Sequence, residues 1–146
     1  MTIIVSEHID ASPATVWKVM RDVEHWPEWT PSVTSASLLD DAPLAIGSRV
    51  RMKQPRLPAS ELTVTELEED RGFTWVSQSP GLLAIGRHHI EPEGTGSRVS
   101  LSMSFEGTLG SLVELLVRDL TQRYVRMEAD GLKARSESLE RQAASA

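Results

Sequence analysis

The chain has 146 residues, of which 40% are hydrophobic and 25% charged, and it carries a formal net charge of −6 without a single cysteine. This size and composition predict one soluble globular domain over residues 1–146. The acidic balance argues against binding a nucleic-acid backbone, which requires clustered Lys and Arg. The lack of cysteine excludes disulfides and zinc–thiolate sites, and no apolar run approaches the ~18 residues of a membrane span.

The first segment, residues 1–12, lacks the basic and long apolar regions of a signal peptide. Together with the missing cysteines, this predicts a cytoplasmic protein. Residues 3–9 have the apolar character of a first strand. Ser12 then offers a helix N-cap and Pro13 suits the first helical position, which predicts a short amphipathic helix from residue 13 to about 23. Pro27 can open a second short helix, and Pro31 limits its extent.

From residue 32 to 107 the apolar pattern changes to a period of two. Turn-like segments rich in Gly, Pro and Asp separate the apolar runs, without room for helical crossovers, so an antiparallel meander is expected. Each strand has one apolar and one water-facing side. The predicted strands are Val33–Leu39, Ser48–Gln54, Glu61–Leu67, Phe73–Ser79, Leu83–Glu91 and Arg98–Glu106.

The last segment, from about Leu109 to Gln142, is predicted to form one long helix. Its expected apolar stripe consists of Leu109, Leu112, Val113, Leu116, Val117, Leu120, Tyr124 and Met127. Gly131 lies further along the same stripe, where a glycine costs about 1 kcal/mol relative to Ala. Either the helix packs closely against another backbone there, or the missing side chain leaves space for a ligand. The final turns are expected to protrude.

These elements predict an α+β fold, in which a twisted sheet curls around the long helix and encloses volume between them. The run IDASPATVWKVMRDVEHWPEWTP, residues 9–31, resembles the START-like or polyketide cyclase–dehydrase and lipid transport (SRPBCC) superfamily. The segments TWVSQSPG, GRHHIEPEGTGSRVSLSMSFEG and RYVRMEADGLKARSE are similar to a bacterial branch of it. The resemblance implies the helix-grip fold: a seven-stranded antiparallel curved sheet wrapped around a long C-terminal helix, with two short helices after the first strand.

Three of the four tryptophans, Trp17, Trp26 and Trp29, lie within residues 9–31. Alone, they could form a stacking surface for nucleic-acid bases, but the acidic chain argues against that. In the helix-grip order of elements we expect them to anchor the two short helices. Trp17 would pack inward, while Trp26 and Trp29 would hold the Pro-bracketed turn against the sheet.

The superfamily shares a cavity and not a reaction, so the resemblance leaves several functions open. Our leading hypothesis is binding of a hydrophobic or aromatic small molecule, lipid- or polyketide-like, between the sheet and the C-terminal helix. One alternative is a polyketide cyclase/dehydratase-like enzyme that uses His88 as acid or base. Another is a protein-interaction module with a vestigial cavity. We expect no cofactor, no nucleic-acid partner, and a monomer or homodimer.

The expected ligand-binding residues are mostly apolar and converge between the sheet and the long helix, although each could equally be packed core. The predicted set is Met52, Phe73, Trp75, His88, Leu101, Met103, Leu120, Tyr124 and Met127.

His88 is the chemically versatile member of this set. The parity of its strand is ambiguous, but placing Arg87 in water turns His88 inward, where the resembling proteins also carry a histidine. A contact of His88 with Glu128 or with Tyr124 is possible, and so is a plain hydrogen bond to a neighbour. Because His88 and His89 project to opposite faces, a metal site is not expected.

Overall fold

The computed structural model describes residues 2–145 of the chain. Within them, strands and helices follow in the predicted order. Their bounds are β1 Thr2–Ile9, α1 Pro13–Arg21, the 3₁₀ helix η1 Val23–Glu28, β2 Ser35–Leu38, β3 Arg49–Lys53, β4 Ser60–Glu68, β5 Gly72–Ser79, β6 Leu82–Glu93, β7 Gly96–Glu106 and α2 Gly110–Ser145.

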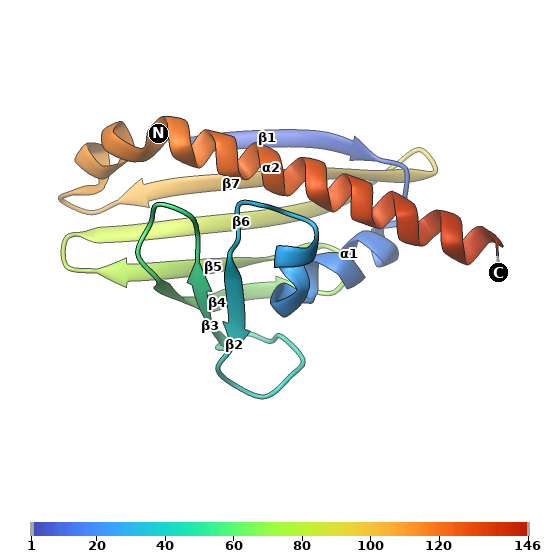
Figure 1. Cartoon of the computed structure of the whole chain (residues 1–146), viewed down its shortest axis with the longest axis horizontal. Helices are drawn as coiled ribbons and strands as arrows, with labels where there is room; N and C mark the ends of the chain where they lie inside the picture. Colours follow the sequence, from blue (N-terminus) through green and yellow to red (C-terminus); the bar gives the residue numbers. More distant parts are fainter. Residues whose placement is uncertain (1, 146) are drawn as a thin grey trace.

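The strands form one antiparallel seven-stranded sheet in the order β1-β7-β6-β5-β4-β3-β2. Strands β2 to β7 make the predicted meander, and β1 adds to its far edge beside β7. In the row that crosses the middle of the sheet, Leu101 pairs with Val5 and with His88, which in turn pairs with Phe73. Helices α1 and α2 lie on one face (Figure 1). The predicted α+β helix-grip architecture is confirmed.

Helix α1 forms for the reasons that its sequence indicates. The Thr15 N–H donates to Oγ of Ser12 at 3.2 Å, and Pro13 occupies the first turn, where its missing N–H is not needed. The helix buries one apolar side, which includes Trp17 and Met20.

The second short helix starts earlier than the sequence predicted. It begins at Val23 and contains Pro27, whereas we expected Pro27 to open it. The carbonyl of Trp26 accepts hydrogen bonds from the N–H groups of both Trp29 and Thr30, at 3.0 Å each. The turn therefore closes beyond Pro27 without needing the N–H that proline lacks.

Helix α2 packs on β1, β7 and α1, but only in part with the stripe that the sequence predicted. Of that stripe, Tyr124 is buried and Val113, Val117, Leu120 and Met127 are half-buried, whereas Leu109, Leu112 and Leu116 are exposed. Its first leucines are exposed, and the buried positions start further along the helix. These are Gly110, Glu114, Thr121, Tyr124, Val125, Ala129, Leu132 and Ser136. A helix of 36 residues is about 54 Å long, whereas the 12 residues of β6 span about 40 Å. At least one end of α2 must therefore extend beyond the sheet.

The C-terminal half of α2 is held more firmly than expected. Glu140 accepts hydrogen bonds from the Ser12 N–H at 3.0 Å and the Thr15 hydroxyl at 2.6 Å, and Ser136 is fully buried. Only residues 141–145 are exposed along the final turns, which extend beyond the sheet (Figure 1). Within residues 2–145, no helix is both long enough and apolar enough to cross a membrane.

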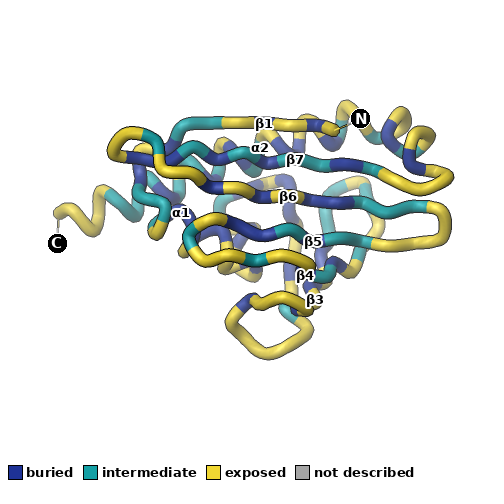
Figure 2. Tube along the Cα trace, turned by 180° about the vertical axis from the view of Figure 1, so that it is seen from behind, coloured by how far each residue is buried: buried dark blue, intermediate teal, exposed yellow. Residues whose placement is uncertain are grey.

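On its other face the sheet carries no helix formed by residues 2–145 (Figure 2). Along β6, the exposed Arg87 and His89 alternate with the buried His88 and Ile90. This alternation resolves the ambiguous parity of the strand: His88 points toward the helices, as predicted.

Candidate functional site

Four ring systems meet on the inner face of the sheet, and we call Trp26, Phe73, Trp75 and His88 the aromatic cluster. The imidazole of His88 stacks on Phe73 with ring centroids 4.3 Å apart and an interplanar angle of 13°. Trp26 reaches across from η1 and lies 5.3 Å from Trp75 and 5.6 Å from His88, centroid to centroid. Such offset and edge contacts add to the stabilisation that burial provides.

The sheet register explains why these rings meet. Phe73 and Trp75 are two residues apart on β5 and so share a face, and their partners on β6 are His88 and Gly86. A β-carbon at Gly86 would lie 2.8 Å from Nε1 of Trp75. The glycine therefore leaves room for the indole to lie over the neighbouring strand.

His88 forms a buried polar pair with α2. Its Nε2 lies 3.1 Å from Oε1 of Glu128, and the two side chains expose only 5% and 15% of their surface. Its Nδ1 lies 3.2 Å from the carbonyl oxygen of Phe73. Because a carbonyl only accepts, a hydrogen bond here requires the proton on Nδ1, which leaves Nε2 facing the carboxyl group of Glu128.

Of the two contacts of His88 that the sequence left open, the structure contains the one with Glu128. Tyr124 turns elsewhere: its hydroxyl donates to the carbonyl oxygen of Pro55 at 2.5 Å. This bond ties α2 to the loop between β3 and β4.

The other predicted ligand-binding residues fall into two groups. Met52 and Leu101 are buried in the hydrophobic core that also contains the aromatic cluster's Trp26. Met103 packs against that core and is half-buried. Leu120 and Met127 are half-buried on α2. The predicted set therefore runs from the packed interior to a partly exposed border.

A hollow of about 550 Å³ lies on the opposite, helix-free side of the sheet. Exposed side chains of β6 such as Arg87 and His89 contribute to it, together with Ile46, Thr65 and Thr74. Phe73 and His88 of the predicted set also line this hollow, but no residue of α2 does, so the hollow does not lie between the sheet and α2.

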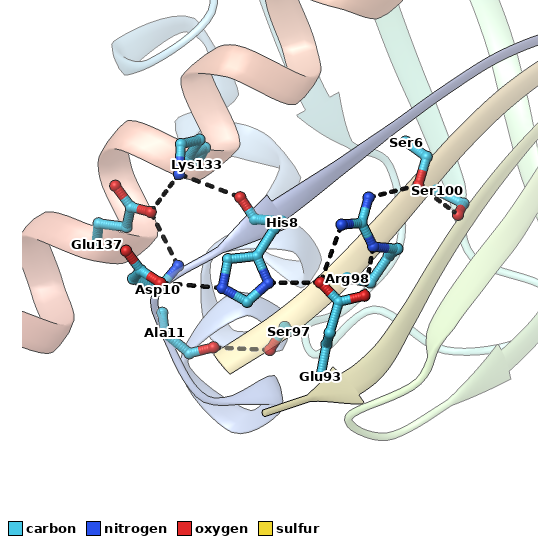
Figure 3. Close-up of polar contacts among 10 residues, drawn as sticks. All are labelled: Ser6, His8, Asp10, Ala11, Glu93, Ser97, Arg98, Ser100, Lys133 and Glu137. Carbon is cyan, nitrogen blue, oxygen red and sulfur yellow. Dashed lines mark hydrogen bonds and ion pairs between the residues drawn. The ribbon is translucent and has the colours of Figure 1, made fainter. Parts of the chain in front are cut away.

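A second polar group, which we call the His8 cluster, was not recognised in the sequence (Figure 3). Nδ1 of His8 lies 2.7 Å from Oε1 of Glu93, and Nε2 lies 2.9 Å from Oδ1 of Asp10. Hydrogen bonds to Glu93 and then to Asp10 raise the pKa of His8. Arg98 donates to Glu93 at 2.5 Å, and this bond lowers the pKa of that carboxyl group.

Helix α2 joins this cluster through Lys133 and Glu137 (Figure 3). Nζ of Lys133 donates to the carbonyl oxygen of His8 at 3.1 Å and to Glu137 at 2.6 Å. Glu137 also accepts the backbone N–H of Asp10 at 2.8 Å. Burial opposes ionisation of Glu137, but these hydrogen bonds outweigh it and lower its pKa.

The His8 cluster fastens the end of β1 to α2. Directly bonded members lie up to 127 residues apart in the chain, as Asp10 and Glu137 show, and only the predicted antiparallel pairing of β1 could have hinted at them. Within residues 2–145, no group of three or more His, Asp or Glu side chains is arranged to hold a metal ion.

The chain matches a known family over most of its length. Residues 1–137 match the family described as "Polyketide cyclase / dehydrase and lipid transport". No curated protein matches the chain. Among solved structures, TTHA0849 from Thermus thermophilus is 23% identical with a TM-score of 0.75, and the match covers 95% of this chain and 99% of that one.

Two further structures show the same fold. The hypothetical protein jhp0584 from Helicobacter pylori is 18% identical with a TM-score of 0.79, over 93% of this chain and 88% of that one. A START superfamily protein from Mycobacterium smegmatis is 19% identical with a TM-score of 0.74, over 94% and 98% of the two chains. The seven-stranded helix-grip fold and the match over residues 1–137 together show that the chain belongs to the polyketide cyclase/dehydrase and lipid transport family.

Proposed function

We propose that the protein binds a hydrophobic or aromatic small molecule, lipid- or polyketide-like, between the inner face of the sheet and α2. The observation that carries this proposal is a polar pair set into an apolar surface. The His88–Glu128 pair lies beside aromatic rings, and the neighbouring Met103, Leu120 and Met127 keep part of their surface exposed. A largely apolar lining with few polar groups is typical of small-molecule sites.

The nine predicted residues would then have different tasks. The rings of Phe73 and Trp75 offer a rigid wall for an aromatic ligand. The His88–Glu128 pair would offer a hydrogen bond to a polar group of the ligand. Met103 and Met127, being flexible and polarizable, would adapt to its shape. Met52, Leu101, Leu120 and Tyr124 would complete the lining.

The half-buried side chains indicate where such a ligand would enter. Met103 lies on β7, opposite Gly86, and Leu120 lies on the part of α2 before the Tyr124–Pro55 bond. A ligand that enters at this border would reach the aromatic cluster along Met103. Opening the β3–β4 loop would widen the path, because that loop is tied to α2 through Tyr124.

Native mass spectrometry of the protein purified from its own host tests the proposal, followed by thermal-shift screening with a lipid and aromatic panel. We expect a retained apolar molecule. Met103→Trp should abolish its retention by filling the border of the site, whereas Ile4→Trp should not, because Ile4 is 64% exposed at the outer edge strand. If wild-type protein retains no molecule and no panel member shifts its melting temperature, the binding proposal fails.

The same pair also favours a second function, a polyketide cyclase/dehydratase-like enzyme. The His88 imidazole lies 3.1 Å from the carboxyl group of Glu128, and its Nδ1 faces the carbonyl oxygen of Phe73, so Nε2 would have to leave Glu128 to exchange a proton with a substrate. Replacing His88 by Ala separates the two functions. A binding protein would lose only the contribution of one hydrogen bond, about 1 kcal/mol, and so keep most of its binding free energy, whereas an enzyme would lose turnover by orders of magnitude.

A further inference from the structure

The residue before α2 and the first turns of the helix expose four leucines, which we call the leucine patch. Leu109, Leu112, Leu115 and Leu116 are 46%, 55%, 76% and 74% exposed. They lie at the end of α2 opposite the C-terminus, where the helix follows β7 (Figure 1). Scattered surface leucines need no explanation, but a contiguous apolar surface marks a site of interaction.

The leucines face solvent because the opposite side of the same turns is the buried one. At 100° per residue, Leu112, Leu115 and Leu116 lie within an arc of roughly 100°. The buried Gly110 and Thr121 lie on the other side of the helix. These turns thus present their leucines to water, while the side that faces the protein buries Gly110, Glu114 and Thr121.

The charged residues that follow the patch are mainly basic. Between residues 117 and 126, the charged side chains are Arg118, Asp119, Arg123 and Arg126, and all four are exposed. Glu114, within the turns of the patch, is buried, so the exposed side chains from residue 112 to 126 carry three positive charges and one negative. The whole chain, by contrast, carries a net charge of −6. An anionic surface would therefore attract this end of the molecule and repel the remainder.

We propose that the leucine patch docks on the surface of an anionic lipid bilayer. The leucines would enter the boundary between headgroups and acyl chains, and Arg118 and Arg123 would contact lipid phosphates. A second copy of the chain fits this surface less well. Stable protein interfaces bury about 800 Å² per partner, which four leucine side chains cannot supply. This docking is separate from the proposed small-molecule site and is tested without its ligand.

The absence of cysteine makes a site-specific experiment possible. Leu115→Cys, labelled with an environment-sensitive nitrobenzoxadiazole dye, is titrated with vesicles made of phosphatidylcholine with a minor fraction of phosphatidylglycerol. We expect a blue shift and a several-fold rise in emission, much weaker with pure phosphatidylcholine vesicles. The same dye on Ile46→Cys is the matched control, because Ile46 is 66% exposed in the loop between β2 and β3 and should report no insertion.

Unlabelled variants complete the test by vesicle flotation. Leu115→Gln combined with Leu116→Gln should weaken binding at least tenfold, while Ile46→Gln should leave it unchanged. Arg118→Gln combined with Arg123→Gln should remove the preference for anionic vesicles. Circular dichroism confirms that each variant is folded. The proposal is overturned if wild-type protein does not float with anionic vesicles, if the leucine variant floats equally well, or if the leucines prove to hold a homodimer together by light scattering.

Discussion

Gly131 of α2 lies against the backbone of Trp29 so closely that a β-carbon at this position would overlap the Trp29 carbonyl oxygen. The same β-carbon would come within 2.9 Å of Cε3 of the Trp29 ring. Of the two explanations that the sequence left open for this glycine, close backbone packing is therefore the correct one. The contact presses the long helix onto the turn that contains Trp26 and Trp29, whose rings lie 5.4 Å apart.

Gly131→Ala should destabilise the protein, although alanine favours a helix by about 1 kcal/mol. Inserting a methyl group into a close-packed contact costs about 1–3 kcal/mol, and here the opposing atoms belong to backbone. Urea denaturation at neutral pH measures the change. Ala134→Gly, at an exposed position of the same helix, measures how much the exchange between Ala and Gly changes stability through helix propensity alone. A Gly131→Ala protein more stable than wild type would contradict the close packing.

Single and double replacements of His88 and Glu128 should change the free energy of unfolding by different amounts. Glu128→Leu leaves Nε2 of His88 buried without its carboxyl partner and should cost about 3–5 kcal/mol. Glu128→Gln retains a hydrogen-bonding group and should cost about 1 kcal/mol. Combining His88→Phe with Glu128→Leu should recover much of the lost stability, because neither residue is then an unpaired polar group. Urea denaturation measures the free energy of unfolding of each variant. If the losses of the two single variants simply add up in the double variant, His88 and Glu128 do not stabilise each other.

Glu7, at the interface of β1 and α2, should make the stability of the protein depend on pH. Burial first, and then a hydrogen bond with Asp130, raise the pKa of Glu7 above its ordinary value of 4.5. The folded protein thus holds this proton more tightly than the unfolded chain. Its stabilising contribution is complete below the ordinary value of 4.5 and is lost as the pH rises through the raised pKa. Relative to wild type, Glu7→Gln should therefore become more stable as the pH rises from acidic to neutral.

Thermal melts of wild type and Glu7→Gln at several pH values check this expectation. Asp40→Asn provides a control of opposite sign, because hydrogen bonds from Arg49 lower the pKa of Asp40. Its variant should lose stability relative to wild type as the pH rises toward and above the unfolded value near 3.8. A constant difference between Glu7→Gln and wild type over the whole range would show that Glu7 does not titrate abnormally.

Tyr124→Phe removes the hydroxyl that donates to the carbonyl oxygen of Pro55. We expect a loss of about 1 kcal/mol and a more mobile β3–β4 loop. Hydrogen exchange at the Leu57 amide, which donates to the carbonyl of Gln54 within that loop, should become faster. Amides of the β6–β7 turn serve as the internal control. Unchanged exchange at Leu57 would mean that the loop is held by other contacts.

The sequence alone determined the order of the elements, the antiparallel meander and the inward direction of Phe73 and Trp75. These follow from local chemistry: a capping serine, turn residues, and apolar side chains repeating every second residue. The tryptophan-rich segment also indicated the family, because its proline and tryptophan spacing accompanies the two short helices of this fold.

Only the tertiary structure decided which side of α2 is buried. Apolar periodicity placed Leu112 and Leu116 on the inner side, but a helix longer than the sheet can leave its first turns uncovered, and both leucines are exposed. The choice between Glu128 and Tyr124 as the partner of His88 likewise depended on where α2 crosses the sheet. The same holds for the contact of Gly131 with Trp29, which joins residues 102 positions apart. Local patterns specify which face of an element is apolar, whereas distances between elements depend on how the whole chain packs.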